Sequence, residues 1–319
     1  MMRLLPLTTL LTLGVLLVSC LSLWHGLGPV FGQPWTASDL EVLRALRLPR
    51  LMAALASGAL LGLAGTAVQA FFRNPLAEPG LVGVSAGAAL AAAAALSVAS
   101  ALPVVAGCAF LGGLAALGVI RRLAGRGSRA RLILAGVAVN ALLTSLLILL
   151  MTTLPDSALR TVTFWLLGSF AGAGWPEAAT LALAVPLTGF ALGGLWRFLN
   201  ALQTGEASAF HLGFAVDRLG RRLMIWVAVA VGLVVAQCGS VSFVGLMAPH
   251  LARQLVGGEL RRLLLTAPLM GALLTVLADW VARAAFAPAE LPVGAITSLA
   301  GAPFFLWLLA RRDRRQTDA

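Results

Sequence analysis

The chain has 319 residues, of which 60% are hydrophobic and 11% charged, and its formal net charge is +11 at pH 7. This balance excludes a soluble globular domain and indicates a membrane protein that crosses the bilayer many times. The positive charge lies in short arginine clusters between apolar runs and not along one face, so no nucleic-acid partner is expected.

Nine apolar runs follow one another, separated by charged or Pro/Gly-rich segments. One helical crossing needs about 20 apolar residues, so the length allows about ten crossings and leaves little for a soluble domain. We expect one all-α membrane domain over residues 1–319, embedded in lipid. The first run is interpreted as a span and not as a cleaved leader, because more membrane sequence follows it. The runs cover residues 4–24, 51–72, 81–98, 101–120, 132–152, 178–196, 223–252, 263–286 and 292–310.

Arginine placement predicts the orientation of these runs. The arginine clusters fall on alternate loops, which are expected to be cytoplasmic. Arg222 and Arg253 must then lie on the same side, but the apolar run between them is too short for two full crossings at 1.5 Å per residue. Gly239 and Gly245 are the predicted break points. The prediction is ten helical segments, one of them truncated, with both termini in the cytoplasm.

The segment from Arg73 to Gly87 interrupts the apolar pattern with a cation, an anion, two prolines and three glycines. Such backbone is tolerated at membrane depth only where it is buried in protein or lines a wet cavity. The segment is therefore a candidate for a transport pathway. Taken by itself, it fits an ordinary loop outside the lipid equally well.

Polar residues within the runs have structural and functional interpretations. Asn140 is expected to face a cavity or to bond a neighbouring helix, because a bare amide in lipid is costly. Asp279 lies one turn before Arg283, which predicts a structural i,i+4 ion pair. Glu290 is predicted to cap the last helix, and these two acids near the outer end are the candidates for ion binding. The cysteines and histidines show no metal-ligand spacing, so we expect no metal site and no cofactor.

Four motifs together resemble one known family: RLPR from Arg47, RNPLAEPGLVGVSAGA from Arg73, GSVSFVGLMAPHLAR from Gly239 and ELPVGAITSLAGAPFFLWLL from Glu290. In this order and spacing they resemble the FecCD-type permeases of bacterial ABC importers for ferric siderophores, haem and cobalamin. The resemblance spans nearly the whole chain. It implies a ten-helix inner-membrane subunit that forms a homodimer with the substrate path at its axis. The implied partners are two cytoplasmic ATPase subunits and a periplasmic substrate-binding protein.

Arginines on the outer side are candidates for docking that binding protein. Positive charge is scarce there, and a guanidinium suits bidentate binding of a carboxylate. The resemblance implies that Arg47, Arg50 and Arg283 receive glutamates of the binding protein. From the residues alone, the alternative is that they cap helix ends or extend to the lipid interface.

The resemblance also implies two constrictions on the substrate path. The cytoplasmic gate, in the loop before the fifth helix, corresponds to Ser128, Arg129 and Ala130. Arg129 departs from the short polar residues of the family, which leaves the chemistry of this gate open. The second constriction corresponds to the NPL turn at Asn74, Pro75 and Leu76.

A segment in a predicted cytoplasmic loop, GEASAFHLG, resembles the motif with which permeases contact their ATPases. A glutamate, small residues and a closing glycine predict a short helix with a sharp exit. An unremarkable amphipathic loop is the alternative, and the segment from Pro249 to Arg262 is a second candidate for the same contact. The residues assigned to coupling are Gly205, Glu206, Ala207, Ser208, Ala209 and Gly213.

No P-loop, nucleophile elbow or HExxH pattern appears, so the chain is predicted not to be an enzyme and to depend on a partner ATPase. The predicted function is to accept haem from a binding protein and pass it inward, with cobalamin second and ferric siderophores third as cargo. Two alternatives come from other classes. An ion-coupled secondary transporter would need embedded acids and no ATPase, and a membrane-embedded enzyme would need clustered catalytic groups.

Overall fold

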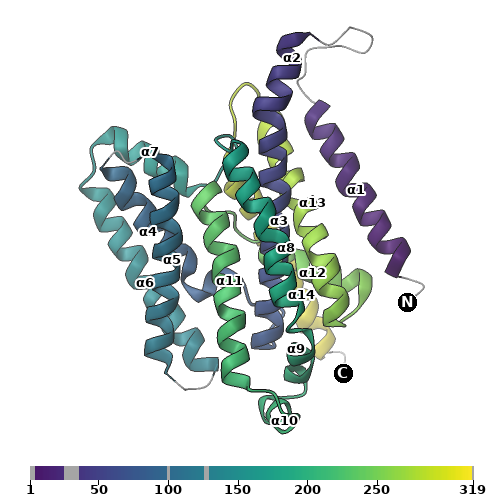
Figure 1. Ribbon diagram of the computed structural model, residues 1–319. Helices are drawn as coiled ribbons and strands as arrows, with labels where there is room; N and C mark the ends of the chain where they lie inside the picture. Colours follow the sequence, from purple (N-terminus) through teal and green to yellow (C-terminus); the bar gives the residue numbers. More distant parts are fainter. Residues whose placement is uncertain (1–3, 25–35, 99–100, 126–128, 318–319) are drawn as a thin grey trace.

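The computed structural model describes residues 4–24, 36–98, 101–125 and 129–317, and this part of the chain is helical without strands (Figure 1). Short helices occur among long ones, and two short stretches are π-helical (η1) and 3-10 (η2). The elements are α1 (Leu4–Trp24), α2 (Ala37–Val42), η1 (Leu43–Arg47), α3 (Leu48–Phe72), η2 (Pro79–Val82), α4 (Val84–Ser97), α5 (Leu102–Ala124), α6 (Arg129–Thr152), α7 (Asp156–Leu166), α8 (Trp175–Gly193), α9 (Trp196–Gln203), α10 (Glu206–His211), α11 (Val216–Cys238), α12 (Val244–Val256), α13 (Leu260–Ala284) and α14 (Val293–Thr317).

Ten of the described segments form the membrane architecture. Seven are long and apolar enough to cross a bilayer: α1, the continuous stretch from α2 through α3, α5, α6, α8, α11 and α13. Two shorter apolar helices, α4 and residues 293–308 of α14, and the truncated α12 complete the set. The predicted all-α architecture of about ten segments is therefore confirmed.

The helix ends differ from the predicted runs where arginines occur. The structure continues α5 to Ala124 and begins α11 at Val216, several residues into charged sequence. Arginine is a good helix former and its long side chain can reach water from a helix end, so charge does not end the helix. Three helices that carry too many polar residues to stand out as apolar runs, α2, α7 and α9, were not predicted.

The predicted break in the run 223–252 is present. Helix α11 ends at Cys238, Gly239 has φ +71°, and α12 begins at Val244. At 1.5 Å per residue the 13 residues of α12 span about 20 Å, less than the roughly 30 Å of a hydrocarbon core. Gly245 was predicted as a second break point, and this is wrong: it lies inside α12, where it packs closely against Gly65 of α3.

Helix α3 is the centre of the bundle, since it contacts α8, α11, α12 and α13. Its closest neighbour is α13, and glycines allow that approach. A Cβ built on Gly271 would overlap the carbonyl oxygen of Gly58, and one built on Gly58 would overlap that of Gly271. Small residues at helix crossings allow the backbone contact that stabilises packing in lipid, where hydrophobic burial contributes little.

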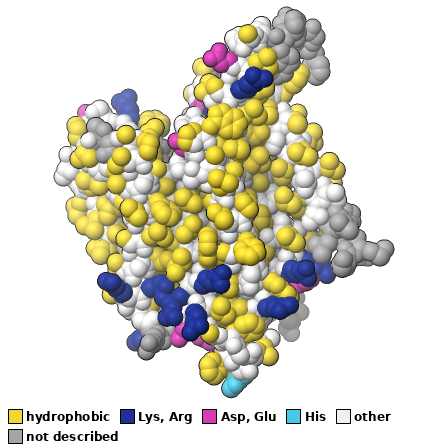
Figure 2. All heavy atoms as spheres, viewed as in Figure 1, with side chains coloured by type: hydrophobic (Ala, Val, Ile, Leu, Met, Phe, Trp, Pro, Cys, Tyr) yellow, Lys and Arg dark blue, Asp and Glu magenta, His cyan; other side chains and the backbone are white. Residues whose placement is uncertain are grey.

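The bundle has two groups of helices and two chemically different ends. Helices α4, α5, α6 and α7 form one group, α1, α3, α8, α12 and α13 form the other, and α11 lies between them (Figure 1). Hydrophobic side chains cover a broad central band, and arginines gather below it (Figure 2). We call the end that holds α10 and the start of α11 the basic end. The end that holds α2 and α7 is the opposite end.

Candidate functional site

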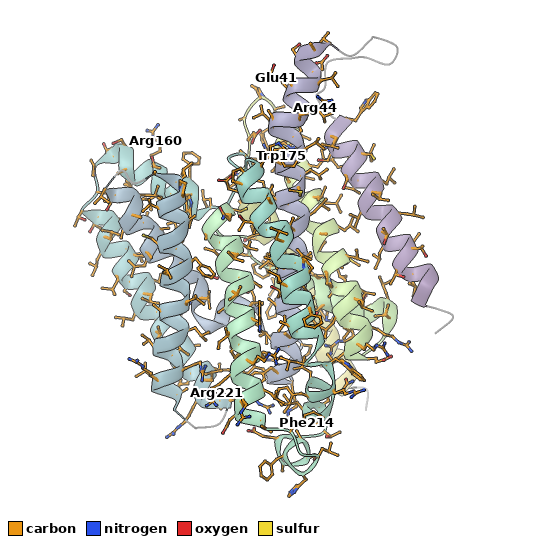
Figure 3. The ribbon with its side chains drawn as sticks, in the orientation of Figure 1. Glu41, Arg44, Arg160, Trp175, Phe214 and Arg221 are labelled. Carbon is orange, nitrogen blue, oxygen red and sulfur yellow. The ribbon has the colours of Figure 1, made fainter. Side chains whose placement is uncertain are left out.

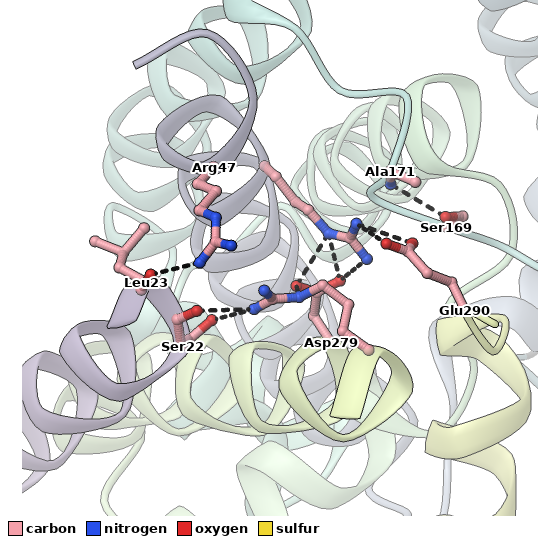
Figure 4. A network of polar contacts seen from close by, with 9 residues as sticks. Ser22, Leu23, Arg47, Ser169, Ala171, Asp279 and Glu290 are labelled. Atoms are coloured by element: carbon pink, nitrogen blue, oxygen red, sulfur yellow. Dashed lines mark hydrogen bonds and ion pairs between the residues drawn. The ribbon is translucent and has the colours of Figure 1, made fainter. Parts of the chain in front are cut away.

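Five charged side chains form a cluster near the opposite end, which we call the arginine network: Arg47, Arg50, Asp279, Arg283 and Glu290 (Figure 4). Asp279 of α13 is its centre, with a side chain only 3% exposed. Its carboxylate lies 2.9 Å from Nη2 of Arg50 and 3.2 Å from Nε of Arg283. The predicted i,i+4 pair between Asp279 and Arg283 is confirmed, and Arg50 is a second partner that the sequence spacing did not reveal.

Glu290 was predicted to cap the last helix, and the structure gives it a different role. Its carboxylate receives two hydrogen bonds from Nη1 of Arg50, at 3.0 and 2.9 Å. Glu290 also lies three residues before α14 begins at Val293. Arg50 therefore bridges two acids, one buried and one 47% exposed, in a bidentate manner that suits its planar guanidinium.

The other two arginines of the network reach the end of α1. Nη1 of Arg47 donates to the carbonyl oxygen of Leu23 at 2.7 Å, and Nη2 of Arg283 donates to Ser22. The structure thus brings together Arg47, Arg50 and Arg283, and their role in docking stays a prediction. Three arginines against two acids leave the network with one net positive charge.

More exposed cations lie elsewhere at the opposite end. Arg44 and Arg160 are exposed, and both point away from the bundle (Figure 3). Neither makes a side-chain ion pair with the part of the chain that the structure describes. No sequence motif contains either residue, so the sequence alone gave them no role.

The NPL turn follows α3 directly. Arg73 ends that helix in the left-handed region, with φ +50°, and the Oδ1 atom of Asn74 accepts a hydrogen bond from the backbone N–H of Leu76 at 3.0 Å. Asn74 is exposed, whereas Pro75 and Leu76 are half-buried. The local hydrogen bond explains why an asparagine stands here, since a short amide side chain can close such a turn.

Glu78, in the same segment, joins two interrupted helices. Its Oε1 atom accepts a hydrogen bond of 2.9 Å from the backbone N–H of Phe243, immediately before α12. Phe243 has φ +63°, which is rare for a bulky side chain. A carboxylate suits the start of a helix because the unpaired N–H groups there carry partial positive charge. The acids near the outer end are thus not the only embedded ones, since Glu78 lies deeper in the bundle.

The residues mapped to the gate meet the predicted coupling segment. Helix α6 begins at Arg129, whose Nη1 donates to the carbonyl oxygen of Phe71 at 3.0 Å and whose guanidinium lies 5.0 Å from the ring centre of Phe71. Nη2 of Arg129 lies 3.5 Å from Oε2 of Glu206. Ala130 is in the first turn of the same helix, and Ser128 lies outside the described residues. Arg129 therefore connects α3, α6 and α10.

The predicted short coupling helix is present as α10, which projects from the basic end (Figure 1). Gly205 has φ +128° and Gly213 has φ +86°, so glycines form both the entry and the exit. Glu206, Ala207 and Phe210 are exposed, whereas Ala209 is buried. The segment therefore presents a small protruding surface at the basic end.

Asn140 is half-buried on α6 and makes no interhelical hydrogen bond to the residues that the structure describes. Most of α6 is exposed, since this chain buries only 11% of the apolar stretch of that helix. Bonding to a neighbouring helix of the same chain was one of the two roles considered for Asn140, and the structure does not show it.

The family model of the FecCD transport family matches residues 4–311, which include both interrupted segments and the arginine network. The chain belongs to the FecCD transport family. The resemblance of the four sequence motifs to FecCD-type permeases is therefore confirmed.

Two relatives of this FecCD protein are named as permease proteins of transport systems. It is 38% identical over 283 residues to the hemin transport system permease protein HmuU of Yersinia pestis, across 85% of this chain and 84% of that protein. It is 38% identical over 311 residues to the vitamin B12 import system permease protein BtuC of Vibrio cholerae, across 94% and 93% of the two chains.

Solved structures support the same fold. A metal-chelate type ABC transporter in an inward-facing conformation superposes with a TM-score of 0.90 and 32% identity, across 96% of this FecCD chain and 99% of that chain. PsaBC from Streptococcus pneumoniae gives a TM-score of 0.60 at 17% identity and shares the fold alone.

Proposed function

We propose that the chain is the transmembrane subunit of an ATP-driven importer that passes haem from a periplasmic binding protein to the cytoplasm. The observation that carries this proposal is the FecCD match over residues 4–311, in a fold that presents α10 at the basic end. Identity to the haem permease HmuU favours haem as cargo. The same 38% identity to BtuC supports cobalamin as the second candidate.

The basic end is assigned to the cytoplasm of a bacterial inner membrane. Arg121, Arg122, Arg221 and Arg222 lie there, and arginine-rich loops are retained on the cytoplasmic side. With this orientation α10 faces the compartment that contains ATP, where two ATPase subunits would contact Gly205–Gly213.

A homodimer is part of the proposal. Helix α6 is an apolar span that this subunit leaves largely uncovered, with Asn140 half-buried on it. A second copy packed against α6 would cover that surface and place Asn140 beside the path between the subunits. The path would include the gate at Arg129 and Ala130 and the constriction at the NPL turn.

Docking of the binding protein is assigned to the opposite end. The arginine network keeps one net positive charge, and Arg44 and Arg160 add exposed cations at the same end of the bundle. The exposed acids Glu41 and Asp156 share this end, so glutamates of a binding protein would be attracted to the arginines locally and not to the surface as a whole. Arg47 would contribute to their capture. Since Arg50 and Arg283 already hold Asp279, their part in docking is to carry positive charge close to the surface.

The docking assignment has a direct test. The double variant Arg44→Glu, Arg160→Glu should weaken docking and reduce its dependence on salt, because it reverses exposed charge that steers association. The matched control is the double variant Arg122→Glu, Arg222→Glu, which reverses two exposed arginines of the basic end. Affinity of the binding protein for the reconstituted complex is measured at low and high salt. Unchanged affinity in the variant at Arg44 and Arg160 would contradict the assignment.

The function itself is tested by uptake into proteoliposomes. The chain is reconstituted with the ATPase and the binding protein that co-purify with it, and haem and cobalamin are offered separately. We expect ATP-dependent uptake of haem that stops with a hydrolysis-deficient ATPase. Uptake of cobalamin alone would select the second candidate. Uptake that persists without ATPase would instead support an ion-coupled transporter.

A further inference from the structure

A small pocket with an excess of positive charge lies at the basic end, between α5, α6, α10 and α11. Its volume is about 100 Å³, and its charged lining residues are Arg121, Arg129, Arg221, Glu206 and Asp217. One buried water occupies about 30 Å³, so the pocket has room for a group of the size of a phosphate. Arginines from three different helices converge on this one volume.

Two of these arginines lack a counter-ion within the described part of the chain. Arg129 is engaged by Glu206 and by the carbonyl oxygen of Phe71. Arg121 of α5 and Arg221 of α11, in contrast, make no ion pair or side-chain hydrogen bond with any residue that the structure describes, and they repel each other. Two like charges on facing helices repel each other, and an anion between them would offset that repulsion.

The surroundings of the pocket match the headgroup level of a bilayer. On the membrane side of Arg121 and Arg221, Val119 of α5 and Ile225 of α11 are exposed apolar side chains. Arg221 lies at the lower end of α11 (Figure 3), and the arginines of this face form a row beneath the hydrophobic band (Figure 2). Basic pockets between membrane helices on the cytoplasmic side suit the headgroups of anionic lipids.

We propose that this pocket binds the phosphate of an anionic phospholipid of the cytoplasmic leaflet, with Arg121 and Arg221 as its ligands. The acyl chains would lie along the exposed apolar side chains above. The proposal rests on the orientation given under Proposed function. Because Arg129 and Glu206 line the same pocket, the bound lipid touches the connection between the gate helix α6 and the coupling helix α10.

The chain offers matched variants for a test. Arg121→Gln, Arg221→Gln removes the two ligands. Arg122→Gln, Arg222→Gln removes the exposed neighbours on the same helices, which do not line the pocket, and leaves the same net charge. Asp217→Asn removes a lining acid that makes no ion pair with the described residues and that would repel a phosphate.

Lipid binding is measured on the purified full chain by native mass spectrometry with added phosphatidylglycerol, and with phosphatidylcholine as the neutral reference. One basic residue near an anionic surface changes affinity about fivefold, so the ligand double variant should bind phosphatidylglycerol roughly 25-fold more weakly. The control pair should bind as the native chain does, and Asp217→Asn should bind more tightly. This binding measurement does not depend on transport, so a failure of the importer assignment would be detected separately, in the uptake experiment.

Three outcomes would overturn the proposal. An equal loss in the control pair would show that overall charge and not the pocket determines binding. Displacement of the lipid by millimolar inorganic phosphate would identify the ligand as a free anion. Loss of the lipid when the ATPase subunits are added would assign the pocket to that protein interface.

Discussion

Asp279 offers the sharpest test of what holds the opposite end together. The change Asp279→Asn removes a carboxylate whose side chain is 3% exposed and which contacts two guanidinium groups. Arg50 would keep its ion pair with Glu290, but Arg283 would lose its ion pair and keep only neutral acceptors, Ser22 and the amide oxygen of the new asparagine. Removing one partner of a buried ion pair costs about 3–5 kcal/mol, because a buried charge is left uncompensated.

The matched control is Glu290→Gln. Its carboxylate also bonds Arg50 but is 47% exposed, and pairs near the surface contribute about 0–1 kcal/mol. Thermal unfolding of both variants in lipid nanodiscs, followed by tryptophan fluorescence, should show a large fall in Tm for Asp279→Asn and a small one for Glu290→Gln. Equal falls would refute the reasoning that burial decides the contribution of each acid.

Two further predictions concern the core and the basic end. Gly271→Ala should destabilise the protein by about 1–3 kcal/mol, because the added methyl group overpacks against α3. The control is Gly107→Ala on α5, where a Cβ meets nothing within 4 Å and no loss of stability is expected. Thermal unfolding in nanodiscs measures both variants, and equal Tm values would contradict the packing argument. A double-mutant cycle of Arg129→Gln and Glu206→Gln should give a coupling of about 0.2–1 kcal/mol for ATPase binding or stability, because Glu206 is 54% exposed. Additive effects would show that the 3.5 Å pair contributes nothing.

The sequence predicted the architecture well because hydrophobicity and arginine placement act along the chain. Run lengths indicated the spans, and the parity of the arginine clusters identified the interruption near Gly239. Helices such as α7 were missed because they contain too many polar residues to form an apolar run. Gly245 was misassigned because a glycine at a helix crossing and a glycine at a break have the same sequence signature.

The candidate sites were less predictable, since their partners are distant in sequence. The i,i+4 pair of Asp279 and Arg283 was visible from spacing, but Arg50 lies 229 residues from Asp279 and only packing of α3 on α13 brings them together. The same holds for Arg129, whose contact with Glu206 depends on how α6 and α10 meet. The departure of Arg129 from the expected small polar residues was visible, but its consequence was not.

The hydrogen bond between Glu78 and Phe243 restricts how this molecule can move. It ties the turn after α3 to the start of α12, and a lost bond of this kind would expose a charge and a bare amide where little water can replace them. A transport cycle that bends the chain at these interruptions would have to break that tie. The two broken segments should therefore travel as one body, and pivoting should fall at the peripheral loops between the helix groups.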